Sequence, residues 1–221
     1  TPVTAFMAVC PKAASVAVFY MVMTEAMPQL SYSWEILLCI VSVLSMFIGN
    51  LGAIMQTNIK RLIAFSSVSH VGYLLIAIIA KNSLSSSSLM FYMLTYAFMI
   101  FGVFGIVVLL GRKGDENLEI ENYSGLAYKH PIIALTMTIF LLSLGGLPPL
   151  AGFVAKFYIF SAALNEGYLI LVIIAVLNSA ISFYYYLKVI VFMYMKEPVK
   201  SLNVTLSPMT LLVIAISVFG T

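Results

Sequence analysis

Two lysines lie deep inside stretches of this sequence that are apolar enough to cross a lipid bilayer. Lys12 is nine residues into one such stretch, and Lys156 is eight residues before the end of another. At 1.5 Å per helical residue, each lies roughly 12–13 Å from the nearer end of its stretch. A lysine at the bilayer centre costs roughly 2.5–3.5 kcal/mol on insertion scales. Ionisable residues retained at that cost belong mainly to ion pathways and proton relays, which is the chemistry that these lysines predict.

Residues that interrupt a helix precede Lys156 in LLSLGGLPPLAGFVAKFYIF (141–160). They are Gly145, Gly146, Pro148 and Pro149. The prolines lack a backbone donor, so we expect the carbonyls of Leu144 and Gly145 to have no helical partner. A broken helix that carries a buried ionisable group is typical of ion pathways in transporters. The alternative is a lysine whose side chain extends outward to the membrane surface, across roughly 12 Å.

Lys12 directly follows Pro11, which we expect to free the carbonyl of Met7 and to kink the helix beside the charge. An incidental kink with an outward-reaching lysine is the alternative interpretation. His70, in FSSVSHVGY, is also near mid-depth and has three serines close to it in the sequence. Histidine with serines can hold a chain of water molecules, but a lone histidine can equally be a hydrogen-bonded packing residue. All eight acidic residues lie in loops or at helix ends, so no carboxylate is expected to pair with either lysine.

The composition identifies an integral membrane protein, because 62% of the 221 residues are hydrophobic and only 9% are charged, against about 25% in soluble domains. A net charge of +3 is too small to indicate nucleic-acid binding. Cys10 and Cys39 lie in apolar runs without metal-ligand spacing, so we interpret them as small packing residues. The sequence contains no glycine-rich phosphate loop, cysteine cluster or Ser-His-Asp arrangement. We therefore expect proton movement without bond-making chemistry, and no bound cofactor or metal.

The apolar segments predict an all-α membrane bundle of about seven transmembrane helices, one of them discontinuous. The segments are 3–24, 36–55, 59–80, 87–110, 131–164, 168–194 and 208–221. A bilayer core of about 30 Å needs about 20 helical residues, so the fifth segment fits one membrane only if it is interrupted. The last segment is short and the first starts at once, from which we expect residues 1–221 to be one transmembrane domain cut at both ends.

Loop charges predict the orientation of these segments. Loops after the second, fourth and sixth segments contain seven cations, and the other loops contain only Lys81. The seven are Lys60, Arg61, Arg112, Lys113, Lys129, Lys196 and Lys200. The positive-inside rule therefore makes the even loops cytoplasmic. We interpret Lys188 and the preceding tyrosines 184–186 as an interfacial aromatic belt, and loop 111–130 as either an interfacial helix or a plain solvated loop.

Four stretches together resemble the antiporter-like subunits of respiratory NADH–quinone oxidoreductase (complex I). They are TPVTAFMAVCPKAA, GNLGAIMQTNIKRLIAFSSVSHVGYLL, LLSLGGLPPLAGFVAKFYIF and NSAISFYYYLKV, and the resemblance covers essentially the whole chain. Subunits M and L share the general plan but usually carry a histidine-containing pattern in the first stretch, which separates them from this chain with its Lys12. The resemblance implies a fourteen-helix fold of two inverted five-helix repeats, of which 36–194 would be the complete second repeat. By position, Lys12 and Lys156 match the family's relay lysines and His70 a polar residue of its central axis.

The resemblance also implies that NADH, FMN, Fe–S clusters and quinone are bound by partner subunits, with subunits M and K as neighbours in a bacterial plasma membrane or, alternatively, an organellar one. A glutamate and a lysine of the family's first half would be the ion-pair partners. We expect proton translocation through Lys12, His70 and Lys156, coupled to quinone reduction elsewhere. A multi-subunit cation/proton antiporter is the alternative, since it shares the fold and many motifs. A structural subunit without transport is a third possibility, and it predicts that both lysines tolerate replacement by methionine.

Overall fold

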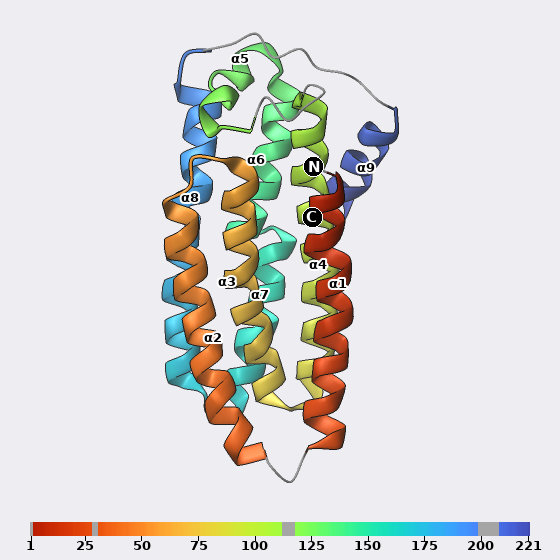
Figure 1. Cartoon of the computed structure of the whole chain (residues 1–221), viewed down its shortest axis with the longest axis vertical. Helices are drawn as coiled ribbons and strands as arrows, with labels where there is room; N and C mark the ends of the chain where they lie inside the picture. The colour runs from red at the N-terminus through yellow and green to blue at the C-terminus, as the bar shows by residue number, and fades with distance from the viewer. Residues whose placement is uncertain (1, 28–30, 112–117, 199–207) are drawn as a thin grey trace.

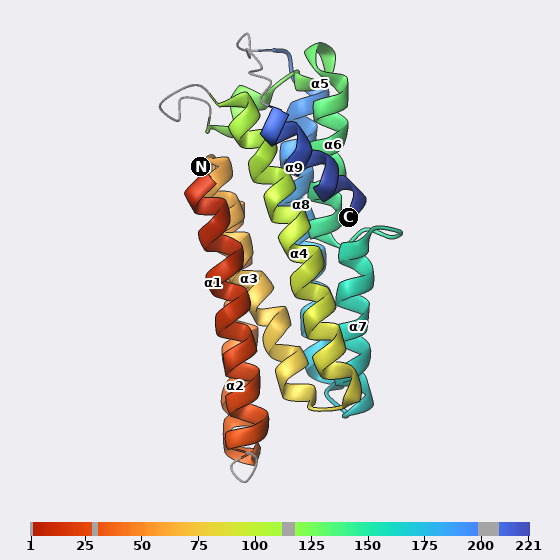
Figure 2. The same ribbon diagram turned by 90° about the vertical axis from the view of Figure 1, so that its right-hand side faces the viewer.

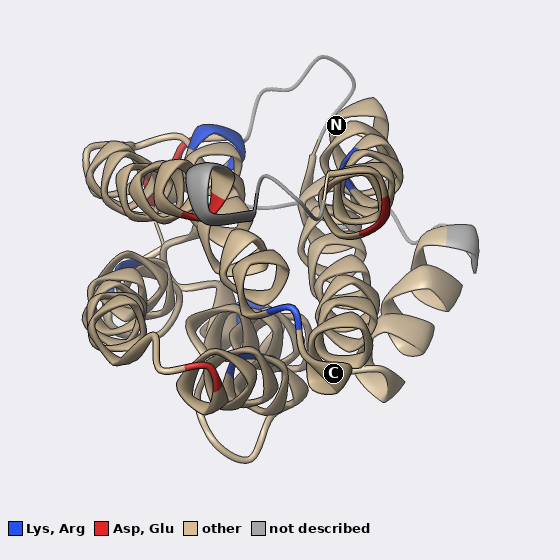
Figure 3. Ribbon diagram, turned by 90° about the horizontal axis from the view of Figure 1, so that it is seen from below, with Lys and Arg blue, Asp and Glu red and all other residues tan. Residues whose placement is uncertain are grey.

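The computed structural model describes residues 2–27, 31–111, 118–198 and 208–221 of the chain. Nearly all of these residues are helical, and they contain no β-strand (Figure 1). The helices stand side by side as a bundle, which Figure 3 shows end-on with few charged positions along it. Three of the loop cations, Arg112, Lys113 and Lys200, lie outside the described residues.

Five helices within the described residues are long and apolar enough to cross a bilayer. They are α1 (Pro2–Met21), which continues into the π-helical turn η1 (Val22–Ala26), α2 (Ser31–Ile54), α3 (Ile59–Ala80), α4 (Ser83–Leu110) and α8 (Leu169–Met195). The shorter helices are η3 (Ile120–Tyr123), α5 (Leu126–Lys129), α6 (Pro131–Gly145), α7 (Ala151–Asn165) and α9 (Pro208–Phe219). The prediction of an all-helical, multi-pass membrane protein is confirmed.

The fifth apolar segment is interrupted, as its glycines and prolines predicted. α6 ends at Gly145, and Gly146 has a φ of +91° that stops the helix; α7 begins at Ala151. Each helix has 15 residues, about 22 Å, and α7 lies below α6 in Figure 2. A Cβ at Gly152 would collide with the Ser143 carbonyl oxygen. This glycine therefore allows the two half-helices to approach closely.

Asparagine caps start two of the long helices where the chain turns back at the bundle ends. The Asn58 side chain accepts hydrogen bonds from the backbone N–H groups of Lys60 and Arg61 at the start of α3. Asn82 caps α4 in the same way and also donates to the carbonyl of Ala162 in α7, at 2.8 Å. Such caps satisfy donors that have no partner within the helix. The second cap also fixes α4 against α7.

Loop 111–130 is neither an interfacial helix nor a plain solvated loop in its described part. It forms η3 and α5, and these turn Ile120, Tyr123 and Leu126 into the core. Backbone hydrogen bonds attach it to the α2–α3 connection, from Ile59 N–H to the Leu118 carbonyl and from Ile120 N–H to the Thr57 carbonyl. Burial raises the pKa of Tyr123, so this phenol stays neutral. The loop therefore covers one end of the bundle.

The aromatic belt expected near the end of α8 is wrong for two of its three tyrosines. Tyr184 is 61% exposed, but Tyr185 and Tyr186 are completely buried. Lys188 donates a hydrogen bond of 3.4 Å to the Gln56 carbonyl at the α2–α3 connection. α8 therefore directs these two tyrosines into the bundle, where their hydroxyls find partners on α2 and α3.

Candidate proton-relay site

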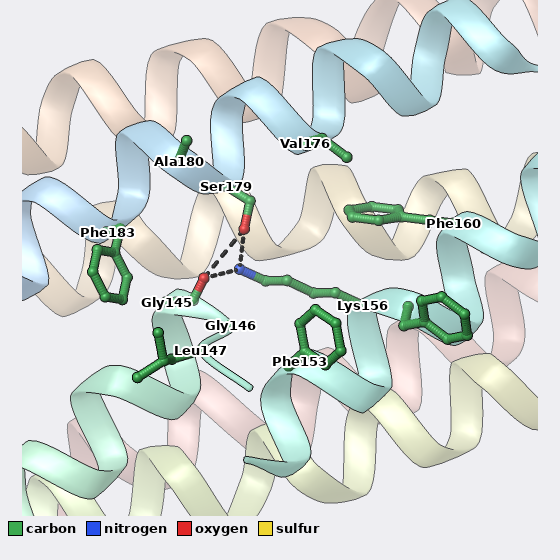
Figure 4. A pocket seen from close by; sticks show the side chains of 11 residues that line it. Gly145, Gly146, Leu147, Phe153, Lys156, Phe160, Val176, Ser179, Ala180 and Phe183 are labelled. Carbon is green, nitrogen blue, oxygen red and sulfur yellow. Dashed lines mark hydrogen bonds between the residues drawn. The ribbon is translucent and has the colours of Figure 1, made fainter. Parts of the chain in front are cut away.

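Lys156 projects from α7 to the end of α6 and is only 4% exposed. Its ammonium donates to the carbonyls of Leu144 (3.1 Å) and Gly145 (2.9 Å) and to the Ser179 hydroxyl of α8 (2.8 Å). Figure 4 shows this group between the α6–α7 turn and α8. The two carbonyls are the ones that the prolines were expected to leave without helical partners. The helix break thus supplies the acceptors that a buried ammonium needs.

The α6–α7 turn and α3 enclose the Lys156 side chain. A Cβ at Gly146 would lie 3.1 Å from Lys156 Cδ and 3.3 Å from Nζ, and its positive φ also favours glycine. On the other side, Nζ lies 5.0 Å from the centroid of the Tyr73 ring. The aromatic face provides a favourable neutral contact for the charge.

Lys12 makes its contacts across to α3 and α4. Its ammonium donates to the Ser67 carbonyl (3.0 Å), the Ser67 hydroxyl (2.6 Å) and the Tyr96 hydroxyl (3.0 Å), and lies 4.4 Å from the centroid of the Tyr96 ring. The structure forms α1 as one helix through Pro11. The Met7 carbonyl, which we expected to be freed, is not among the acceptors of Lys12.

His70 is 2% exposed and lies among tyrosines. Its Nδ1 is 2.6 Å from the Tyr92 hydroxyl and its Nε2 is 3.4 Å from the Tyr186 hydroxyl, which in turn bonds the Ser66 hydroxyl. Both ring nitrogens therefore have hydrogen-bonding partners, an arrangement that a relay requires and that a packing histidine also shows.

Two tyrosines place the three groups in one continuous cluster. The Tyr96 hydroxyl accepts a hydrogen bond from Lys12, its ring faces the Lys12 ammonium, and the ring lies 5.0 Å from the His70 ring, centroid to centroid. Tyr73 lies 5.9 Å from the His70 ring and contacts Lys156 on its other side. The Tyr73 hydroxyl is buried and has no hydrogen-bond partner. Lys12, His70 and Lys156 are thus brought together through side chains on α3 and α4.

These connecting residues were not identified from the sequence. Tyr73 lies three residues after His70, about one helical turn, which puts both side chains on the same face of α3. Tyr92 and Tyr96 are spaced by four on α4, and Ser179 is a polar residue inside an apolar stretch. These residues could have been identified from the sequence as polar side chains that lie within apolar helices and are spaced three or four residues apart.

The charge of the cluster is not balanced by acidic residues. No carboxylate of a described residue contacts Lys12 or Lys156, whereas Lys81 pairs with Glu35 at the far end of the bundle. No group of three or more His, Cys, Asp and Glu residues within the described part of the chain could hold a metal ion. The side chains at this site are lysine, histidine, tyrosine and serine, each of which can accept or donate a proton.

Comparison with known proteins shows the family of this chain. The family model described as "NADH:quinone oxidoreductase/Mrp antiporter, TM" matches residues 1–182. The chain belongs to this family. The resemblance to antiporter-like subunits of complex I is thereby confirmed.

Curated members of the family are similar along most of the chain. It is 49% identical over 196 residues to an NADH-quinone oxidoreductase subunit N of Trichlorobacter lovleyi, covering 89% of this chain and 40% of the relative. It is 40% identical over 217 residues to subunit N of Paramagnetospirillum magneticum, covering 98% of this chain and 45% of the relative. The chain therefore spans less than half the length of these relatives.

Solved structures of the family have the same fold. Respiratory complex I from Thermus thermophilus matches with a TM-score of 0.72 and 32% identity, over 82% of this chain and 41% of that chain. An Mrp complex from Dietzia sp. matches with a TM-score of 0.77 and 25% identity, over 90% of this chain and 37% of that chain. Both of these solved structures are of complexes.

Proposed function

We propose that this chain is part of a proton-translocating membrane subunit of an NADH–quinone oxidoreductase. Lys12, His70 and Lys156 form its proton relay, and quinone is reduced in neighbouring subunits. The observation that carries this proposal is the pair of lysines, each bound by uncharged acceptors and joined through Tyr96, His70 and Tyr73. A lysine shielded from water and bound by neutral acceptors can alternate between ammonium and amine, because desolvation weakens its preference for the charged form.

Each step of the relay moves one proton and leaves the carriers unchanged at the end. His70 takes a proton at one ring nitrogen and releases one from the other, then returns to its first tautomer. Tyrosine and serine hydroxyls accept one proton as they donate another, with water bridging the longer gaps. Lys12 and His70 carry protons along the midplane, and Lys156 exchanges them with the outer side.

The length of the relatives supports a proposal about the wider assembly. The chain covers 40% and 45% of two subunit N sequences, which fits the second of two inverted repeats, with residues 36–194 as its complete five-helix unit in a fourteen-helix protein. The other repeat would provide the glutamate and lysine that pair with this half. Subunits M and K would be the neighbours in a bacterial plasma membrane, and NADH, FMN, Fe–S clusters and quinone would be bound by partner subunits.

Replacing Lys156 by methionine in the full-length subunit tests the relay. The change keeps much of the side chain's volume and removes the ammonium. We expect NADH-driven proton uptake into membrane vesicles to fall at least tenfold, with the complex still assembled on a native gel. Lys188→Met is the matched control, because Lys188 lies at the bundle end, where it donates to the Gln56 carbonyl. Full pumping by an assembled Lys156→Met complex would contradict the relay and favour a structural role.

A cation/proton antiporter is the second candidate, and the likeness to the Mrp complex favours it. The two functions separate in one assay on vesicles that contain the whole complex. An antiporter would move protons in response to a sodium gradient without NADH. The proposed subunit would move protons only while NADH is oxidised. Neighbouring genes give a cheaper indication, with quinone- and NADH-module subunits in one case and small antiporter subunits in the other.

A further inference from the structure

The α6–α7 turn, α7 and α8 enclose a cavity of about 510 Å³ that ends at Lys156. Its volume is within the range of about 300–1,000 Å³ that ligand pockets occupy. Most of the wall is apolar, from Leu147, Phe153, Phe157, Phe160, Val176, Ala180 and Phe183. The polar groups gather at the inner end, where Lys156, the Gly145 carbonyl and the Ser179 hydroxyl meet (Figure 4).

When Lys156 is protonated, the inner end carries a positive charge that no described residue balances. Lys156 is 4% exposed, and all three of its hydrogen bonds go to neutral acceptors. Buried charges in proteins are normally paired, because opposite charges attract strongly where water is excluded. An anionic group in the cavity would therefore be strongly attracted to the Lys156 ammonium.

The ammonium can turn to an anion without leaving a buried group unsatisfied. The Gly145 carbonyl accepts a second hydrogen bond from the Ser179 hydroxyl, at 3.2 Å. If Lys156 exchanges its bond to Gly145 for one to a ligand, this carbonyl keeps a donor. An unsatisfied buried carbonyl would otherwise cost a substantial part of the gain.

The mouth of the cavity opens on the outside of the bundle. Phe153 and Phe157 of α7 are 37% and 55% exposed, and Val176 of α8 is 49% exposed. These apolar side chains belong to the membrane-spanning part of the bundle, so they favour a ligand with an apolar part. An anion with a long alkyl chain would cover them, whereas a small hydrophilic anion would not.

We propose that the cavity binds a long-chain carboxylic acid, with its carboxylate on Lys156 and its alkyl chain against the phenylalanines of α7. The acid crosses the hydrocarbon as neutral RCOOH. It then gives its proton to the Lys156 amine, which leaves RCOO⁻ beside an ammonium, with no change of redox state. The bound carboxylate holds this ammonium in its charged form. In the proposed relay, to which this last step is tied, the ligand would slow proton transfer through Lys156.

Photolabelling of the whole complex in its native membrane tests the binding site. The probe is hexadecanoic acid with a diazirine in the chain, and labelled peptides are mapped by mass spectrometry. We expect labels on the α7 and α8 segments that line the mouth, displaced by hexadecanoic acid and at least tenfold less by its methyl ester. The bilayer is as apolar as the cavity wall, so transfer of the alkyl chain from lipid to the cavity adds little binding free energy. The difference in binding between the acid and its ester therefore comes from the carboxylate.

Three variants separate the cavity from ordinary lipid contact. Lys156→Met should lower labelling at least tenfold. Ala180→Phe should lower it as much, because it fills the cavity while Lys156 remains. Lys12→Met should leave the labelling of α7 and α8 unchanged, since Lys12 contacts α3 and α4 and does not line this cavity.

Three results would overturn the inference. The first is equal labelling by the acid and the ester, and the second is labelling that neither Lys156→Met nor Ala180→Phe reduces; both are expected of a lipid-facing groove. The third is the absence of labelling on α7 and α8 in the assembled complex. If the label binds as expected but Lys156→Met pumps normally, the binding site stands and the proposed relay fails.

Discussion

Lys12 and Lys156 are held in similar ways although they come from different helices. Each ammonium donates to a serine hydroxyl of another helix, Ser67 or Ser179, and to at least one backbone carbonyl. Each also lies within 5.0 Å of a tyrosine ring centroid. Neutral acceptors reduce the cost of burial, whereas a carboxylate would favour the charged form alone. Such surroundings suit a group that must both hold and release a proton.

Tyr96→Phe tests the connection between Lys12 and His70. The variant keeps the ring that faces Lys12 but loses the hydroxyl 3.0 Å from its ammonium. A hydrogen bond to a charged group contributes about 1.5–3 kcal/mol, so we expect the rate of NADH-driven proton uptake to fall about tenfold or more. The control is Tyr158→Phe, because Tyr158 is 47% exposed and packs on Phe91. Equal pumping by both variants would remove Tyr96 from the relay.

The α6–α7 interruption brings a lysine and free carbonyls to one point. Proline and glycine end α6, and the start of α7 then carries Lys156 back onto the last turn of α6. This return depends on close contact between the half-helices. At Gly152 the backbone N–H donates to the Ser143 hydroxyl at 3.1 Å. There is no room there for a side chain.

Gly152→Ala should therefore disturb the site by pushing α6 and α7 apart, without changing any of its proton-carrying groups. The added Cβ would collide with the Ser143 carbonyl, which is backbone and cannot swing aside. Overpacking of this kind costs about 1–3 kcal/mol, so we expect a lower thermal unfolding temperature of the purified complex and reduced pumping.

The control for Gly152→Ala is Gly105→Ala in α4. A Cβ at Gly105 would meet side chains and no backbone, with Ile214 at 3.2 Å and Val213 at 3.9 Å. Alanine also favours a helix over glycine by about 1 kcal/mol. We expect little loss of stability in this variant. An equal loss in both would mean that the half-helix contact is not special.

α8 contributes the polar face that completes the bundle interior. The Asn50 amide of α2 donates to the Asn178 carbonyl and side-chain oxygen, and the Tyr185 hydroxyl donates to Asn50. Tyr186 reaches His70 and Ser66 on α3. A tyrosine at a helix end is typical of an interfacial belt when its hydroxyl has no partner inside. Here buried partners exist, which explains why the sequence interpretation of Tyr185 and Tyr186 was wrong.

The ends of the bundle separate the loops as their charges suggested. The α2–α3 connection, α5 and the end of α8 lie at the upper end in Figure 1, and the α3–α4 and α7–α8 turns lie at the lower end. Lys60, Lys129 and Lys196 lie at the start of α3, the end of α5 and the end of α8, in the upper group. Glu166 lies in the α7–α8 turn, in the lower group. This arrangement is what alternate crossings of one membrane require.

Cysteine labelling tests this sidedness on the full-length protein. Cys10 and Cys39 are first replaced by alanine, and single cysteines are then placed at Lys60, Lys196 or Glu166. A membrane-impermeant maleimide should label the first two from the cytoplasmic side only and the third from the opposite side only. Labelling of Lys60→Cys and Glu166→Cys from the same side would contradict the predicted orientation.

The sequence alone determined the features that depend on local chemistry. Apolar length set the spans, the GGLPP stretch set the break, and the position of Lys12 and Lys156 within apolar runs marked them as lying at membrane depth. These follow from the bilayer's thickness and from backbone hydrogen bonding, which act on each segment separately. The freed carbonyls of Leu144 and Gly145 were found for the same reason, since proline acts on residues only four positions away.

The partners of the buried groups required the packed bundle. Lys12 binds Ser67 and Tyr96, which are 55 and 84 residues away, and His70 meets Tyr186 at a separation of 116. Which polar side chain faces which depends on how each helix is rotated and shifted against its neighbours. That arrangement comes from side-chain packing between helices and is not encoded in any one segment. The sequence could therefore name Lys12, His70 and Lys156, but only the packed helices show the tyrosines that connect them.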